Sequence, residues 1–240
     1  MLQLRGIPPL FCIMPEELIV KFKTFGDFPD LLNQMNSSLI LSTYDANNIF
    51  IIRSEENSLQ GTLVSVVRPM GIAVGKNKIA IGSINKITEY HLFSGQLSEE
   101  MNKDNNDAIF LPRNVHYTGN IDVHEMEYID NELFFVNTLF SCLCKIDMDS
   151  PGSNSFIPVW KPDFITKLAA EDRCHLNCVG SFKKEPRLVS YLAESDEKLG
   201  WKELPKEHGV ILDIKENKKI LTGLSMPHSP RMHNNKLYFL

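Results

Sequence analysis

The sequence has little clustered positive charge and no long apolar run. Its 25 Lys and Arg residues are outnumbered by 30 Asp and Glu, which gives a formal net charge of -5. Nucleic acids and anionic membranes are bound through clustered Lys and Arg, so neither is expected as the main partner. No stretch approaches the roughly 20 apolar residues that span a bilayer. We therefore expect a chain that neither crosses nor binds a membrane.

Cysteine is also sparse. The five cysteines are an odd number in a chain that is large enough to fold without disulfides. The spacings in Cys142-x-Cys144 and Cys174-x-x-x-Cys178 differ from the two-residue gap of common zinc knuckles. This pattern predicts buried free thiols and a cytoplasmic protein.

Several motifs of well-known enzymes are missing from the sequence. It contains no Gly-rich phosphate loop, Walker sequence, Gly-x-Ser-x-Gly elbow or His-Glu-x-x-His pair. Nucleotide-dependent chemistry therefore has no support.

What the sequence does contain is a series of short β-rich runs, separated by Asn, Asp, Gly and Lys from Ser38 to the end. Three hairpins resemble one another in their second strands, which are 78–81, 132–135 and 236–239. Their tight turns are rich in residues that tolerate positive φ. The spacing gives a repeat of about 50 residues with four strands, close to the period of propeller blades.

This repeat predicts an all-β fold, a β-propeller-like array of four-stranded blades; a β-sandwich is the alternative. The last repeat ends after two strands, so we expect one domain over 1–240 that is incomplete at its C-terminus, with 1–27 as an N-terminal extension or first strand. The repeats are expected to start near Leu39, Met70, His124, His175 and His228. Residues expected to be buried in the strands are Ile72, Val74, Ile79, Ile81, Met126, Tyr128, Leu133, Phe135, Leu237 and Phe239.

Three histidines occupy the same position in successive repeats, at the start of the innermost strand. They are His124, His175 and His228, and Met70 takes this place in the preceding repeat. Inner strands line the central channel of a propeller, so these rings are expected to meet at its mouth and to hold a divalent transition metal. Each His could instead hydrogen-bond the backbone of a neighbouring blade and only tie the blades together.

Carboxylates and amides accompany these histidines. Glu125 and Asp172 are candidate catalytic proton acceptors. With Asp122, Asn137 and Asn177 they could form an oxygen-rich calcium site, which is the alternative to a transition metal.

Four residues near the same position are candidates for binding a substrate. Arg173 and Arg231 could clamp a carboxylate or phosphate, because a guanidinium presents a planar fork to such groups. Asn137 and Asn177 could add hydrogen bonds. Ion pairs between blades are the alternative task for both arginines.

Four stretches of the chain are similar to a bacterial family known only as conserved hypothetical proteins with a domain of unknown function. The resemblance extends over nearly the whole chain from about Phe28 and includes a Gly-Trp segment that ends at Trp201. The matching stretches are 118–125 (TGNIDVHE), 135–143 (FVNTLFSCL), 160–177 (ending in LAAEDRCHLN) and 223–231 (GLSMPHSPR). The resemblance implies no activity, since the family is uncharacterised.

Three functions fit these observations. The first is a small-molecule binding site or a metal-dependent enzyme site that the three histidines organise. The second is a non-catalytic propeller scaffold that recognises a protein or glycan. The third is a calcium-dependent, lactonase-like hydrolase, which rests on fold analogy alone.

Overall fold

The structure, a computed structural model, describes residues 23, 26–95, 108–148 and 156–240. Within these ranges nearly all regular structure is β. The helical elements of the described residues are short: α1 (Phe28–Gln34), the 3-10 turns η1 (Gly200–Glu203) and η2 (Lys206–His208). None of them is long and apolar enough to cross a membrane.

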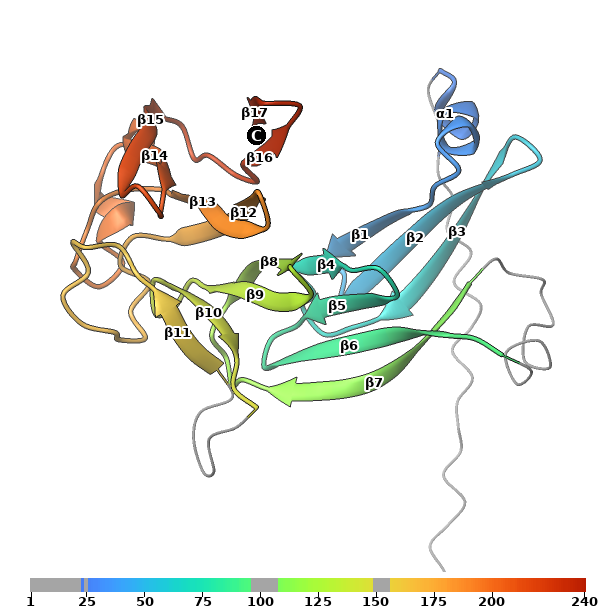
Figure 1. Cartoon of the computed structure of the whole chain (residues 1–240), viewed down its shortest axis with the longest axis horizontal. Helices are drawn as coiled ribbons and strands as arrows, with labels where there is room; N and C mark the ends of the chain where they lie inside the picture. Colours follow the sequence, from blue (N-terminus) through green and yellow to red (C-terminus); the bar gives the residue numbers. More distant parts are fainter. Residues whose placement is uncertain (1–22, 24–25, 96–107, 149–155) are drawn as a thin grey trace, which may run out of the picture. The chain divides into compact units, whose positions relative to one another are not determined.

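The strands form successive sheets that follow the order of the chain (Figure 1). The first sheet contains β1 (Leu39–Thr43), β2 (Asn48–Glu55) and β3 (Ser58–Ser65). The second contains β4 (Ile72–Val74), β5 (Lys78–Gly82), β6 (Lys86–Phe93) and β7 (Ile109–Tyr117). The third contains β8 (Val123–Ile129), β9 (Glu132–Asn137), β10 (Cys142–Ile146) and β11 (Phe156–Trp160). The fourth contains β12 (Leu176–Phe182), β13 (Glu185–Tyr191), β14 (Gly209–Asp213) and β15 (Lys218–Leu224), and β16 (Arg231–His233) pairs with β17 (Lys236–Tyr238).

This organisation confirms the predicted all-β, propeller-like array. In each four-stranded sheet, strands that follow one another in the chain pair antiparallel, as in a propeller blade. The first strand of each sheet is the innermost one. Accordingly, β8 contacts β4 of the preceding blade and β12 of the following blade, and β12 contacts β16.

The described residues divide into two compact units. One comprises 26–39 and 51–62, which are α1 and the outer part of the β2–β3 hairpin. The other comprises 40–50 and everything described from 63 to 240. All residues of the candidate site below belong to this second unit. The single domain over 1–240 stays a prediction, and most of the expected extension 1–27 lies outside the described residues.

Strand β9 shows why the blades stack. Its sequence, Leu133 to Val136, is apolar at every position, and all four residues are buried. Successive side chains of a strand point to opposite faces. Phe134 and Val136 therefore pack toward the fourth sheet, whereas Leu133 and Phe135 pack toward the second. A blade enclosed on both faces needs this continuous apolar run, which differs from the alternating pattern of a sheet with one wet face.

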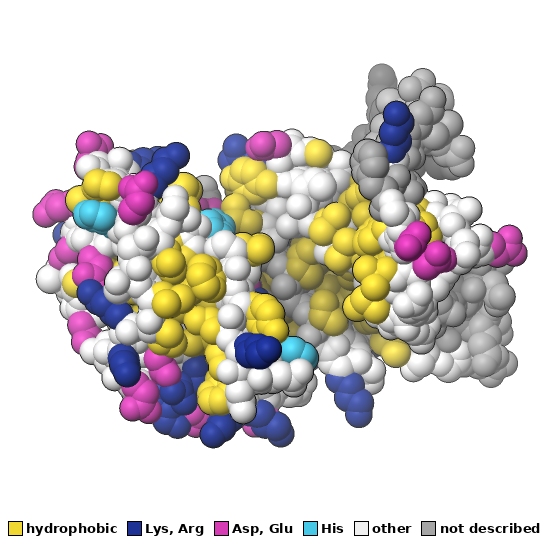
Figure 2. All heavy atoms as spheres, turned by 90° about the horizontal axis from the view of Figure 1, so that it is seen from above, with side chains coloured by type: hydrophobic (Ala, Val, Ile, Leu, Met, Phe, Trp, Pro, Cys, Tyr) yellow, Lys and Arg dark blue, Asp and Glu magenta, His cyan; other side chains and the backbone are white. Residues whose placement is uncertain are grey.

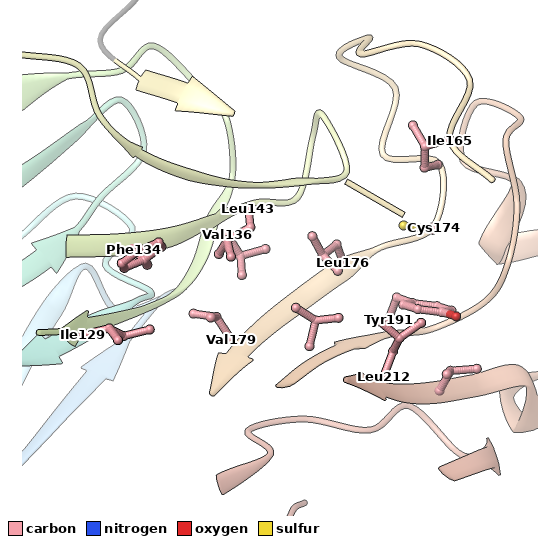
Figure 3. Close-up of a cluster of buried hydrophobic side chains, with 12 residues drawn as sticks. Ile129, Phe134, Val136, Leu143, Ile165, Cys174, Leu176, Val179, Tyr191 and Leu212 are labelled. Carbon is pink, nitrogen blue, oxygen red and sulfur yellow. The ribbon is translucent and has the colours of Figure 1, made fainter. Parts of the chain in front are cut away.

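The larger of these cores lies between the third and fourth sheets (Figure 3). Side chains of β8, β9 and β10 face those of β12, β13 and β14 in this cluster, and Ile165 and Cys174 join it from the connection between β11 and β12. It contains Ile129, Phe134, Val136, Leu143, Ile165, Cys174, Leu176, Val179, Val189, Tyr191, Val210 and Leu212. These contacts fix the start of β12 relative to β8.

The predicted core was wrong at two positions. Val74 is 68% exposed and Phe239 is 41% exposed. Both lie at a strand end: Val74 is the last residue of β4, and Phe239 follows the last residue of β17. Burial at the end of a strand depends on neighbouring segments other than the paired strand, and the alternation of apolar residues in the sequence does not indicate whether such neighbours are present. Of the other expected residues, Ile81, Met126, Leu133 and Phe135 are buried, whereas Ile72, Ile79, Tyr128 and Leu237 are half-buried.

Charged side chains are mixed on the surface of the described residues. Figure 2 shows acidic and basic groups interspersed on the visible face. This agrees with the nearly balanced composition of 25 basic and 30 acidic residues.

Candidate functional site: a cluster of three histidines

The structure places the three repeat-equivalent histidines side by side. The ring centroid of His124 lies 5.3 Å from that of His175 and 5.5 Å from that of His228. His124 is the second residue of β8, His175 directly precedes β12, and His228 precedes β16 by three residues. Because these inner strands are neighbours, residues far apart in the chain meet here.

A left-handed backbone turn precedes or begins each of these strands. The φ angles are 55° at Asp122, 50° at His175 and 53° at Met226. Residues other than glycine rarely adopt such φ angles. Each one costs of order 1–3 kcal/mol, and they occur preferentially at functional sites. The turns redirect the chain from the preceding connection into the inner strand. The turns thereby set the backbone positions from which the three histidine side chains extend.

His175 is held by Asp172 and Trp201. Its Nδ1 lies 2.9 Å from Oδ2 of Asp172 and 3.2 Å from Oδ1. Trp201 donates its Nε1–H to the same Oδ2 at 2.9 Å and stacks on the His175 ring with centroids 4.4 Å apart. A carboxylate only accepts, so Nδ1 of His175 carries the proton and Nε2 keeps its lone pair. This is the arrangement of carboxylate, histidine and metal found behind many metal ligands.

His228 has the same tautomer for a different reason. Its Nδ1 lies 2.8 Å from the backbone oxygen of Met226, which also can only accept. Its Nε2 therefore keeps the lone pair, which accepts a long hydrogen bond of 3.5 Å from Nδ2 of Asn177. Asn177 is fully buried and is fixed by Ser190, whose hydroxyl donates to Oδ1 at 2.5 Å, and by Pro227, whose oxygen accepts from Nδ2 at 3.0 Å.

His124, between the other two, is neutral at physiological pH. Burial lowers the pKa of its ring to about 3, and the positive charges that His175 and His228 would carry lower it further in the same direction. A neutral imidazole has a lone pair on one nitrogen. The cluster therefore provides three rings, of which two have their Nδ1 atoms already engaged by acceptors.

A cavity of about 220 Å³ lies next to this cluster. Asp122 lines it, two residues before His124, and burial raises the pKa of the Asp122 carboxyl while the nearby His175 opposes this shift. Met70, which replaces histidine in the preceding repeat, lines the cavity as well. Its other lining residues are Tyr44, Arg68, Ser83, Ile84, Asn120, Val123 and Leu139.

Two residues that the sequence assigned to the site point elsewhere. Glu125 follows His124 where the pairing of β8 with β9 is irregular, and its carboxylate pairs with Arg231. Arg231 also donates to the backbone oxygens of Val179 at 2.8 Å and Pro230 at 3.0 Å. These contacts tie β8, β12 and the segment before β16 to one another.

Arg173 and Asn137 also have partners within the protein. The guanidinium of Arg173 donates to Glu171 at 2.6 Å and to Asp196 at 2.6 Å. Asn137 is fully buried, and its Oδ1 accepts from the backbone N–H of Phe140 at 3.0 Å. Among the sequence-based candidates, the structure thus brings together His124, His175, His228, Asp172 and Asn177. The roles of all these residues, catalytic, metal-binding or substrate-binding, stay predictions.

The rings have the spacing of metal ligands but not yet the orientation. Around a tetrahedral ion with metal–nitrogen bonds of about 2.0–2.1 Å, the centroids of two histidine rings lie roughly 5 Å apart. The observed separations of 5.3 and 5.5 Å are close to this value. The planes, however, meet at 85° and 43°, and within the described residues no three His, Cys, Asp or Glu groups surround a common point as metal ligands would. Convergence needs rotation about χ2, which is a soft torsion in histidine.

Sequence reasoning missed three residues around the cluster. Trp201 lies in η1, in the connection between β13 and β14, Tyr44 lies between β1 and β2, and Arg68 lies between β3 and β4. The Gly-Trp segment of the family resemblance was a signal for Trp201. Nothing in the spacing of Tyr44 and Arg68 indicates that they share a cavity.

Fold and cluster together define a β-propeller-like protein with three histidines gathered at the start of its inner strands. A family model described as Domain of unknown function (DUF4915) matches residues 26–240, and the chain belongs to this family. The match confirms the resemblance seen in the sequence. No curated protein matches the chain.

Among solved structures, the chain is similar to apo AztD from Citrobacter koseri. The two have 9% sequence identity and a TM-score of 0.36, and the alignment covers 84% of this chain and 52% of AztD. The chain thus spans about half the length of that protein. A likeness of this size assigns neither a ligand nor an activity.

Proposed function

We propose that the chain binds one divalent transition-metal ion through His124, His175 and His228 and presents it to a small molecule in the adjacent cavity. The observation that supports this proposal most is the pair of ring separations around His124, 5.3 and 5.5 Å, together with the engaged Nδ1 atoms of the other two histidines. Hydrogen bonds that fix the outer nitrogen of a histidine are typical of metal ligands.

The donor atoms favour a transition metal over calcium. Imidazole nitrogen suits Zn²⁺, Cu²⁺, Fe²⁺ and Ni²⁺, whereas Ca²⁺ takes six to eight oxygen ligands. The centre of the cluster contains three rings; Asp172 lies behind His175 on its Nδ1 side, whereas the Asn177 amide lies on the Nε2 side of His228. Asp172 is then a positioning residue.

Three histidines leave a fourth position of a tetrahedral ion open. In catalytic zinc sites such a position holds water, whose pKa falls to about 7, or a substrate oxygen. For a catalytic site, Asp122 is the candidate proton acceptor, because its carboxylate lines the cavity two residues before His124. Binding without chemistry would use the same ligands.

The decisive experiment is metal analysis of protein purified without an affinity tag. We expect about one equivalent of transition metal per chain, and loss of most of it in His124→Ala, His175→Ala and His228→Ala. His233→Ala is the matched control, because His233 is exposed and lies in β16, five residues after His228. If the purified protein is metal-free and takes up no Zn²⁺ or Ni²⁺ on titration, the non-catalytic scaffold becomes the favoured function. Stoichiometric calcium would favour the hydrolase alternative.

The cytoplasm is the compartment that we propose. Cys142, Cys144, Cys174 and Cys178 are buried free thiols, as expected in a reducing environment. The sulfur atoms of Cys142 and Cys144 share a hydrogen bond at 3.5 Å and form no disulfide.

A further inference from the structure

The cavity beside the histidine cluster contains two opposite charges that are not paired with each other. Arg68 and Asp122 both line its 220 Å³, and the charge of Arg68 acts on Asp122. Among the described residues, however, neither side chain has an ion-pair partner, and the Asp122 carboxylate has no hydrogen-bond donor. Arg68 is exposed and Asp122 is half-buried, so the two charges line the cavity and remain open to a ligand that enters it from solvent.

Arg68 is exposed, and two contacts bear on its position. Its backbone has φ 47°, and its backbone N–H donates to Oδ1 of Asn47 at 2.9 Å. Its guanidinium carbon lies 5.2 Å from the centroid of the Tyr44 ring, within the range of a cation–π contact. This contact places one face of the guanidinium against the Tyr44 ring and leaves its N–H donors available. A guanidinium with open donors suits a carboxylate, which it binds through two parallel hydrogen bonds.

Asp122 faces the same space from the blade that carries His124. Its own left-handed backbone, with φ 55°, sets the direction of this carboxylate. The remaining wall is partly apolar, with Met70, Ile84 and Leu139. A lone anion in this cavity would be repelled by Asp122, and a lone cation by Arg68. A molecule that carries both charges neutralises both walls at once.

We propose that this cavity binds a small zwitterion of the α-amino acid class, with its carboxylate on Arg68, its ammonium on Asp122 and a short apolar side chain against Met70, Ile84 and Leu139. The volume agrees with a small ligand, because sites for drug-sized molecules measure about 300–1,000 Å³. The inference deepens the proposed function and rests on it only for placing the bound molecule beside the metal.

The test is calorimetric titration of chelator-treated, metal-free protein with the twenty common amino acids, followed by blocked forms of the best binder. For L-valine these would be N-acetyl-L-valine, which lacks the ammonium, and L-valine methyl ester, which lacks the carboxylate. Each blocked form should bind at least about tenfold more weakly than the free amino acid, since each loses one charge-assisted contact.

Two variants assign each charge to its wall. In Arg68→Gln the free amino acid and its methyl ester should bind equally, and in Asp122→Asn the free amino acid and its N-acetyl form should bind equally, as a double-mutant cycle requires. Binding of the blocked forms as tightly as the free form, or no binding by any amino acid, would overturn the inference. Because the protein is metal-free, these outcomes are independent of the metal proposal: metal uptake without amino acid binding removes only this inference, and the reverse removes only the metal site.

Discussion

The Nδ1 atom of His175 lies 2.9 Å from Oδ2 of Asp172, and this contact decides which nitrogen of the ring is available to a metal. Since the carboxylate accepts, the proton resides on Nδ1 and the lone pair on Nε2. Trp201 donates to the same oxygen and keeps the carboxylate from rotating away. The ring is therefore oriented before any ligand arrives, so that less ordering is needed on binding.

Replacing Asp172 by Asn should weaken metal binding about 10- to 100-fold, the usual effect of losing such a supporting contact. The Asn amide can donate to Nδ1 and so favour the tautomer whose Nε2 is protonated. We would measure Zn²⁺ affinity by competition with a chromogenic chelator and check the fold by circular dichroism. Trp201→Phe, which keeps the stacked ring but removes the N–H, should have a smaller effect.

Asp130→Asn is the control for this change. Asp130 lies in the β8–β9 turn with its side chain 72% exposed, far along the strand from His124. The affinity of the Asp130→Asn variant for Zn²⁺ should equal that of the wild-type protein. An Asp172→Asn variant that is folded and binds Zn²⁺ with wild-type affinity would remove Asp172 from the site.

Phe135→Ala should lower the free energy of unfolding by about 3–5 kcal/mol, as for other fully buried phenylalanines. Phe135 is 0% exposed and packs between the second and third sheets. Phe239→Ala is the comparison, because its side chain is 41% exposed and should cost less than about 1 kcal/mol. Urea unfolding of both variants measures the difference, and equal losses would contradict the two-sided burial of β9.

Much of the fold could be predicted because the chain repeats itself. Each inner hairpin carries the same strand pattern, so an alignment within one sequence locates the blades and sets the three histidines in equivalent positions. Equivalent positions in adjacent blades are neighbours in space, which is how the contact of His124 with His175 and His228 could be predicted.

The parts that could not be predicted lie outside the repeat. Trp201 belongs to a connection that has no counterpart in the other blades, and the cavity combines Arg68 from the β3–β4 connection with Asp122 from the β7–β8 connection. Glu125 was assigned to the site from its place beside His124, but its carboxylate pairs with Arg231, at an irregularity of β8 that the sequence does not reveal. Distance along the chain alone does not report which face a carboxylate occupies.

The stability of the protein should fall as the pH decreases from about 4.5 toward 2, in part because of Glu89. Its carboxylate accepts from His116 Nε2 at 2.8 Å and from the Tyr128 hydroxyl at 2.7 Å. The hydrogen bond of His116, followed by that of Tyr128, lowers the pKa of Glu89 from 4.5 to about 2 against the opposing effect of burial. A depressed pKa stabilises the fold above the unfolded value and loses this contribution as the pH falls through the folded value.

Glu89→Gln isolates this contribution. The difference in unfolding free energy between wild type and variant should be largest above pH 5, on the order of 3 kcal/mol at most, and should shrink toward pH 2. Urea unfolding at several pH values gives this difference. Glu132→Gln serves as control, since this side chain is 61% exposed and pairs with Lys145 on the surface. If this difference in unfolding free energy is constant between pH 2 and 6, the hydrogen bonds of Glu89 do not lower its pKa in the folded protein.

Gly180→Ala should loosen the β16–β17 hairpin and weaken metal binding together, because a Cβ at Gly180 would collide with the backbone oxygen of Pro230. Backbone cannot yield as a flexible side chain can, so the segment that carries His228 must shift, at a cost of about 1–3 kcal/mol. Hydrogen exchange should become faster in the β16–β17 amides, and Zn²⁺ affinity should fall toward that of His228→Ala. Gly119→Ala is the control: it has open space around it and a φ of +72°, so it should cost about 1 kcal/mol of backbone strain without either effect. If Gly180→Ala speeds exchange in the hairpin but keeps full metal affinity, His228 is not a ligand and the site must be sought in His124, His175 and Asp122.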